Sequence, residues 1–203
     1  TGTKQPALNV ADANMGGRDS ITFDGVDDAL GMVSPAYGAL AALTLYLVVR
    51  GVIAESAKRY FVIGNNGSAE SIQIQNTASN GLPLFAYERA VGNITSRRFD
   101  NGVPASTGDI RIYAATVDCA AAAASSIVTR CRLGAINTSN LVNGSGTGVA
   151  ISSTHNAVLG ANNTGTANFG SFTLAEFIVC NSVHSMDQMR KIELYLAGYY
   201  GLL

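Results

Sequence analysis

The densest group of side chains suited to binding a ligand lies between residues 87 and 98. It combines one aromatic ring with guanidinium and amide groups: Tyr87, Arg89, Asn93, Arg97 and Arg98. Sugars have apolar C–H faces that pack on aromatic rings, and their hydroxyls exchange hydrogen bonds with such polar groups. The mixture therefore predicts a carbohydrate site on one loop region, and a solvated hairpin of the same composition is the alternative.

Two Asn pairs form further candidate binding loops, and they are Asn65 with Asn66 and Asn162 with Asn163. An amide side chain both donates and accepts hydrogen bonds, which suits a hydroxyl-rich ligand. Asn also tolerates the left-handed backbone of tight turns, so a purely structural turn is the alternative at both places.

Three acids, Asp24, Asp27 and Asp28, follow Phe23 in one short segment and could hold a calcium ion. Calcium binds clustered carboxylate oxygens, and it is the only cofactor that the sequence brings into question. The full calcium-loop pattern is absent, however, and Asp side chains in an Asp-Gly turn also bond the local backbone. Both the calcium site and the structural turn stay open.

Catalytic residue types do not occur in a pattern typical of a hydrolase. Glycosidases use two carboxylates about 5–10 Å apart, which on a strand usually means acids two residues apart, and the sequence has no such pair. Asp118 and Glu176 are isolated acids. The two histidines, His155 and His184, have no Gly-x-Ser-x-Gly motif to accompany them. We therefore predict no catalytic residues and a protein that is not an enzyme.

The composition argues against several kinds of partner and site. The 203 residues carry a formal net charge of −1, so we expect no basic face that would bind nucleic acid. The longest apolar runs, such as Leu43–Val49, are too short for membrane insertion. Cys119, Cys131 and Cys180 form no C-x-x-C pair, so we expect buried, reduced thiols rather than a disulfide framework or a zinc site.

The apolar pattern predicts that the scaffold for these side chains consists of strands. Short apolar segments alternate with Asn-Gly and Asn-Asn turn signals, which is typical of a β-sandwich or barrel. Leu43–Val49 is apolar on both faces and should be a central strand between two layers. Residues 120–124 are interpreted as a connection between strands. The other predicted strands are Arg59–Ile63, Ile72–Gln75, Leu84–Tyr87, Ile110–Val117, Ile127–Leu133, Asn156–Leu159 and Phe172–Val179.

One amphipathic helix is predicted from about Met186 to Ala197. Ser185 is the expected N-cap, and Gln188 stands three residues later, as a capping box requires. Gly198 or Gly201 can supply the left-handed residue that ends the helix. We expect the helix to cover an edge or an opening of the sandwich. Its predicted apolar stripe consists of Met189, Ile192, Tyr195, Leu196 and Tyr199.

The segments Phe23–Asp28 and Ala175–Val179, followed by Ile192–Leu196 in the helix, together resemble a known family. They are similar to the concanavalin A-like, laminin-G-like jelly-roll domains of bacterial and phage surface proteins. Ile110–Asp118 and Asn156–Gly160 extend the resemblance over most of the chain. It implies an all-β, concanavalin A-like jelly-roll β-sandwich with one short C-terminal α-helix, in a single domain covering residues 1-203.

The sequence departs from this family in having no Trp. Such domains often begin some tens of residues earlier, with a strand and a Trp-containing segment. The resemblance therefore implies that an N-terminal strand either lies upstream in a longer protein or is missing from this member. A missing strand would leave a sheet edge open or have a neighbouring chain fill it.

The resemblance implies a non-enzymatic surface-recognition module of a phage or bacterial structural protein, such as a tail fibre. Its expected partner is a host-surface glycan or protein receptor, bound by loops at one end or face of the sandwich. The expected location is extracellular, on the virion or the bacterial cell surface, in a homo-oligomer or a larger virion assembly. A purely structural capsid, tail or baseplate protein is the first alternative, and a polysaccharide-degrading enzyme is the second.

Overall fold

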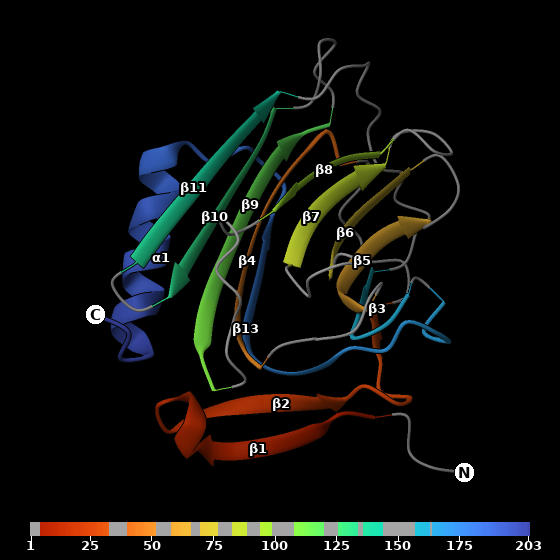
Figure 1. The fold of residues 1–203 in the computed structure, drawn as a ribbon, viewed down its shortest axis with the longest axis vertical. Coiled ribbons are helices and arrows are strands. Elements are labelled where there is room, and N and C mark those ends of the chain that lie inside the picture. Colours follow the sequence, from red (N-terminus) through yellow and green to blue (C-terminus); the bar gives the residue numbers. More distant parts are fainter. Residues whose placement is uncertain are drawn as a thin grey trace.

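The fold is a β-sandwich with a helix on the outside of one sheet (Figure 1). This computed structural model describes residues 5–32, 40–51, 58–65, 70–76, 83–88, 94–98, 108–119, 126–133, 136–143, 157–162 and 164–203. Within them, two sheets of seven and six strands pack face to face, and every strand pair is antiparallel. The predicted all-β sandwich with a C-terminal helix is confirmed.

The seven-stranded sheet carries the helix on its outer face (Figure 1). Its strands, in spatial order, are β1 (Ala7–Asp12), β2 (Arg18–Asp24), β13 (Ser171–Cys180), β4 (Ala42–Arg50), β9 (Ile110–Asp118), β10 (Ser126–Leu133) and β11 (Ile136–Asn143). A short 3-10 helix, η1 (Ala13–Met15), connects β1 and β2.

The six-stranded sheet closes the other side of the sandwich. Its order is β3 (Leu30–Met32), β12 (Ala157–Leu159), β5 (Arg59–Asn65), β6 (Glu70–Asn76), β7 (Pro83–Glu88) and β8 (Ile94–Arg98). All eight predicted strands are present, whereas β2 and the four strands at the sheet edges, β1, β11, β3 and β8, were not predicted.

Strand β4 lies in the middle of the seven-stranded sheet and is buried on both faces, as predicted. Leu45 and Leu47 point into the core between the two sheets. Tyr46 and Val48 point the other way, into a second core under the helix. A strand covered on both faces has no polar face to show to water, which explains its uninterrupted apolar sequence.

Helix α1 (Met186–Tyr199) begins at the predicted residue and ends two residues later than predicted, with the expected N-cap and left-handed glycine. The Ser185 hydroxyl accepts a hydrogen bond from the Gln188 N–H, and the Gln188 side chain accepts one from the Ser185 N–H. At the other end Gly201 adopts a left-handed φ of 67°. The N–H groups of Gly201 and Leu202 then bond carbonyls of the last helical turn, which is a Schellman motif.

The position of α1 and part of its buried face differ from the prediction, whereas Met189, Ile192 and Leu196 of the predicted stripe do pack against the sheet. The helix lies flat on the outer face of the seven-stranded sheet, not at an edge or an opening (Figure 1). Its buried side chains are Met189, Glu193, Leu196 and Ala197. Tyr195 and Tyr199, which were placed in the apolar stripe, are 69% and 42% exposed.

The two tyrosines are exposed because the buried face of the helix includes an acid, Glu193. Glu193 points at the sheet and accepts hydrogen bonds from the Arg130 guanidinium on β10, with 2.8 Å between Nη2 and Oε2. The Glu193 side of the helix therefore faces inward.

Of the helices in the described part of the chain, none is long and apolar enough to span a bilayer.

The cysteines lie in or beside the cores. Cys119 and Cys131 are buried between the sheets, as predicted, and Cys180 is half-buried at the end of β13.

Candidate functional site

The predicted group around residues 87 to 98 spans two neighbouring strands at the edge of the six-stranded sheet. The register places Tyr87 on β7 diagonally opposite Arg97 on β8, with Arg98 next in the chain. Diagonal neighbours on adjacent strands are about 7–8 Å apart, so Tyr87 and Arg97 are close in the sheet. Arg89 and Asn93 lie outside the described residues, so a binding site that uses them stays a prediction.

The two predicted Asn loops lie at opposite ends of the six-stranded sheet. Asn65 is the last residue of β5, whereas Asn162 follows β12, which runs antiparallel to β5. The seven residues of β5 separate the two ends by roughly 20 Å. These loops therefore do not share one end of the sandwich. Asn66 and Asn163 lie outside the described residues.

Asn162 organises its own loop. Its side-chain oxygen accepts hydrogen bonds from the Thr166 N–H at 3.0 Å, the Ala167 N–H at 3.2 Å and the Thr164 hydroxyl at 3.0 Å. An amide oxygen has only two lone pairs, so this one has little capacity left for a ligand. The geometry favours the structural turn at this position.

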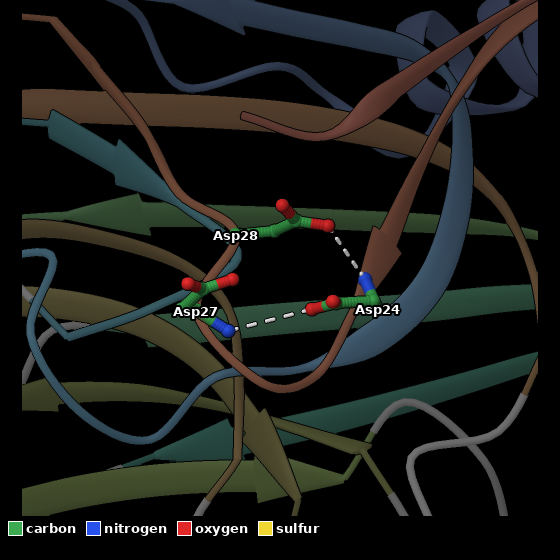
Figure 2. Close-up of side chains that lie close together, drawn as sticks. All are labelled: Asp24, Asp27 and Asp28. Atoms are coloured by element: carbon green, nitrogen blue, oxygen red, sulfur yellow. Dashed lines mark hydrogen bonds between the residues drawn. The ribbon is translucent and has the colours of Figure 1, made fainter. Parts of the chain in front are cut away.

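Figure 2 shows that two of the three clustered acids, Asp24 and Asp28, also accept hydrogen bonds from the backbone of their own segment. Their oxygens lie within 4.8 Å of one another. The buried Asp28 carboxylate accepts from the Asp24 N–H at 2.8 Å, and the Asp24 carboxylate accepts from the Val26 N–H at 2.7 Å. These bonds support the structural turn, and calcium binding stays a prediction.

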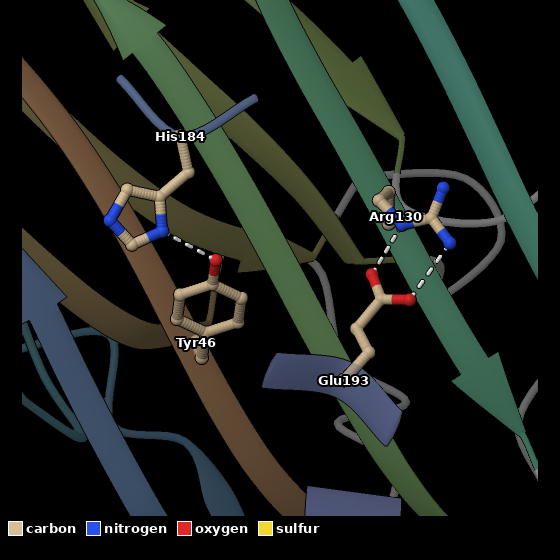
Figure 3. A network of polar contacts seen from close by, with 4 residues as sticks. All are labelled: Tyr46, Arg130, His184 and Glu193. Atoms are coloured by element: carbon tan, nitrogen blue, oxygen red, sulfur yellow. Dashed lines mark hydrogen bonds and ion pairs between the residues drawn. The ribbon is translucent and has the colours of Figure 1, made fainter. Parts of the chain in front are cut away.

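Figure 3 shows that His184 belongs to a structural network at the start of the helix. Its Nδ1 lies 2.8 Å from the Tyr46 hydroxyl, and its backbone N–H donates to the Thr44 hydroxyl at 3.0 Å. Burial raises the pKa of Tyr46 above the ordinary phenol value, so this phenol stays protonated at neutral pH. His184 thus joins the central strand β4 to the segment before α1.

A polar hollow that the sequence did not reveal lies where β2 and β13 separate beside the end of α1. It has a volume of about 350 Å³ and is lined by Gly17, Arg18, Asp19, Ala175, Glu176, Tyr199 and Tyr200. The ladder between the two strands ends at the pair Leu174 and Ile21. The charged side chains of the hollow come from the residues just beyond that pair.

A bulge in β13 directs Glu176 into the polar hollow. Leu174 pairs with Val49 on β4, but Glu176 pairs with Val48, so Ala175 is one extra residue in β13. Val49 faces the core between the sheets, and Val48 faces the helix. Since paired residues share a face, the bulge turns Glu176 toward the helix, where its Oε2 lies 3.3 Å from the Tyr200 hydroxyl.

A second irregularity fixes Asp19 on β2. The register between β1 and β2 shifts between Asn9 and Asp12, and Ala11 within this shift has a left-handed φ of 51°. The Ala11 N–H donates to the Asp19 carboxylate at 2.9 Å. The bulged hairpin therefore holds one acid of the hollow through the backbone of its neighbour.

Two exposed tyrosines on α1 form a stacked pair, the tyrosine platform, that leads to the hollow. The rings of Tyr195 and Tyr199 are 6.2 Å apart between centroids and 18° from parallel. The Arg18 guanidinium carbon lies 4.0 Å from the centroid of the Tyr199 ring, which is cation–π geometry. Tyr200 packs edge-on to Tyr199 at 5.1 Å.

The pKa of the Tyr200 hydroxyl reflects the burial and the negative charge of the hollow. Burial raises its pKa above the ordinary phenol value, and the negative charge of Glu176 raises the pKa further. The phenol therefore stays protonated and donates to the Glu176 carboxylate. Two carboxylates and one guanidinium line the hollow, so its side chains carry one net negative charge.

The sequence contains a signal for this site, but one that is easily misassigned. Tyr195 and Tyr199 are four residues apart, the spacing that places two side chains together on a helix. Without knowledge of the buried Glu193, that spacing indicates the core. Arg18, Asp19 and Glu176 come from distant segments, and only the register of the sheet brings them together.

The comparisons with known proteins place the fold among jelly-roll β-sandwiches. No family model matches the sequence, and no curated protein matches it. Among solved structures, the chain is similar to tailspike protein 2 of a bacteriophage of Escherichia coli O157:H7, with 15% identity and a TM-score of 0.63 over 96% of this chain. A heptameric SAP-like pentraxin from Limulus polyphemus has 12% identity and a TM-score of 0.60, covering 85% of this chain and 80% of the pentraxin.

A carbohydrate-binding module of a Ruminococcus gnavus sialidase, in complex with α2,3-sialyllactose, has 10% identity and a TM-score of 0.57. The match covers 93% of this chain and 96% of the module. In contrast, the chain spans only 26% of the length of the tailspike protein. At these identities the likenesses show the fold alone, which is a jelly-roll β-sandwich with one C-terminal helix.

Proposed function

We propose that this chain is a non-enzymatic module that binds a glycan on a host surface, as part of a phage or bacterial structural protein. The polar hollow and the tyrosine platform are its binding site. The observation that carries the proposal is the exposed ring pair of Tyr195 and Tyr199 beside a hollow with charged hydrogen-bonding groups. Aromatic rings combined with a few convergent polar groups are typical of small-molecule sites.

The geometry suits a pyranose ring. The C–H face of the sugar packs on the Tyr199 ring, and a second residue of the glycan extends toward Tyr195. The hydroxyls of the sugar on Tyr199 donate hydrogen bonds to Asp19 and Glu176 and accept one from Arg18. Each such contact contributes on the order of 1 kcal/mol, so an isolated site of this kind binds with a Kd of the order of 1 mM. Several copies in an oligomer would multiply this affinity.

The two similar structures from a phage tailspike and a glycan-bound module support the choice of ligand class and of an extracellular location. The proposal that the glycan is bound rather than cleaved rests on the partners of the two acids. Glu176 is engaged by the Tyr200 hydroxyl, and Asp19 is engaged by the Ala11 N–H. Both carboxylates thus have a structural role that does not require a reaction. The concanavalin A-like subclass of the jelly roll is part of the same proposal.

The decisive experiment compares the binding of the wild type to an array of bacterial envelope glycans with that of three variants, Tyr199→Ala, Met186→Ala and Arg97→Ala. Tyr199→Ala removes the ring beside the hollow and should abolish binding, whereas Met186→Ala removes an exposed side chain near the other end of the helix and should not. Equal binding by the Tyr199→Ala variant and the wild type would refute the proposed site. If only Arg97→Ala loses binding, the binding site is instead the group that the sequence predicts around residues 87 to 98. Release of reducing ends from a bound polysaccharide would refute the non-enzymatic assignment.

A role in assembly is the second candidate, and the β1 edge favours it. Within the described residues β1 pairs only with β2, and its Leu8 and Val10 side chains are 68% and 73% exposed. Leu8 also lines an apolar groove of about 320 Å³ with Ile21 and Phe177. Exposed apolar edge strands are typical of association surfaces. An oligomer in light scattering that Leu8→Asp dissociates, without any glycan binding, would favour this candidate.

A further inference from the structure

Acidic groups outnumber basic groups around the polar hollow. Asp19 and Glu176 both line it, and Arg18 is the one basic side chain among its lining residues. Glu176 is held on the helix side by the β13 bulge, and Asp19 is held by the Ala11 N–H. The bulge and the Ala11 N–H thus fix the positions of both acids.

The positive charge of Arg18 is directed at the platform. Its guanidinium carbon lies 4.0 Å from the centroid of the Tyr199 ring, so the group stacks on an aromatic face. In that position its charge interacts with the ring, and its edge N–H groups are still able to donate to a hydroxyl. A bidentate grip on a ligand carboxylate would compete with two fixed carboxylates beside it.

We propose that the hollow selects neutral sugars and discriminates against sugars that carry a carboxylate, such as sialic and uronic acids. This inference rests on the proposed function of the same site. Two neighbouring hydroxyls of a neutral sugar donate to the two oxygens of one carboxylate, which accepts but cannot donate. An acidic sugar instead brings a third carboxylate to a site that already carries one negative charge in excess.

The test uses matched pairs of oligosaccharides on an array and in solution titrations. Each pair presents one neutral oligosaccharide, such as lactose, with and without a terminal sialic acid. The wild type should bind the neutral member at least tenfold more tightly at low ionic strength. The difference should shrink in 1 M salt, where the screening length falls to about 3 Å.

Charge variants identify the cause of the preference. The double variant Asp19→Asn with Glu176→Gln keeps the size of both side chains and should bring the two members of each pair within about threefold. Asp187→Asn removes an exposed acid from the first turn of the same helix and should leave the tenfold preference intact. If thermal melting shows that the double variant does not fold, the single Asp19→Asn variant replaces it and should show an intermediate preference for the neutral oligosaccharide.

The outcomes separate this inference from the proposed function. If the acidic oligosaccharide of a pair binds as tightly as the neutral one, and Tyr199→Ala abolishes the binding of both, the inference is wrong and the glycan site is supported. A neutral preference that survives the double variant also overturns the charge mechanism. If the wild type binds no member of any pair, the proposed function and the inference fall together.

Discussion

The ion pair between Glu193 and Arg130 connects the only charged side chain on the inner face of α1 to strand β10 (Figure 3). Glu193 has 0% relative exposure, and Arg130 is also buried. Replacing Glu193 by Ala leaves the guanidinium in a dry site without its counter-charge. Removing one partner of a buried pair costs about 3–5 kcal/mol, far more than losing an exposed ion pair.

This cost should be measurable in the melting temperature. For a domain of this size each kcal/mol shifts the midpoint by about 2–4 °C, so Glu193→Ala should melt roughly 6–20 °C below the wild type. Lys191→Ala on the exposed side of the same helix should change the free energy of unfolding by less than about 0.5 kcal/mol. Differential scanning calorimetry and urea titration of the same variants provide both quantities.

A double replacement separates the charge effect from packing. Glu193→Leu combined with Arg130→Met removes both charges and keeps the volume, and it should be close to the wild type or up to a few kcal/mol more stable. The reasoning is refuted if the double variant is as unstable as Glu193→Ala, because the loss would then come from shape. It is also refuted if Glu193→Ala unfolds like the wild type.

Three further predictions concern a close contact, a turn and a buried phenol. Gly160→Ala should lose about 2–4 kcal/mol in urea titration, because φ is +83° and the new Cβ would lie 2.3 Å from the Phe23 ring. Gly17→Ala, with φ +75° and open space, should lose only about 1–2 kcal/mol. Asp28→Ala should lose about 1–2 kcal/mol in the same titration, since a turn N–H loses its acceptor. The Tyr200 pKa is raised in the folded state, so the folded protein loses stability as the pH rises above the ordinary phenol pKa of about 10. Tyr200→Phe should therefore flatten the fall in the free energy of unfolding between pH 9 and 12. An unchanged fall would contradict this.

The interior strands other than β2 could be predicted from the sequence, but the edge strands could not. β4 and β9 are covered on both faces, and their apolar runs are unmistakable. β8 and β11 end their sheets, and their sequences, such as Ile-Thr-Ser-Arg-Arg, are largely polar. A strand with one neighbour needs less apolar surface, and polar residues there also discourage edge-to-edge association. Their polar sequences were therefore taken for loops.

The capping residues of the helix could be read directly, because Ser185, Gln188 and Gly201 act within a few residues of the chain. Which face of α1 is buried depends instead on Arg130, more than sixty residues earlier. The polar hollow depends on the same kind of distant information. Two register shifts and the end of the helix must all be known before Asp19 and Glu176 can be placed in one site.

The bulge at Ala175 determines which face of the sheet carries the acid of the hollow. If β13 paired with β4 without this bulge, Glu176 would lie opposite Leu47 in the dry layer between the sheets, and Phe177 would turn toward the helix, with every side chain type unchanged. Point substitutions at Glu176 can alter the charge of the site, whereas a change in register would move that charge to the other face of the sheet. Domains of this fold that lack the bulge would therefore present a different charge beside the helix.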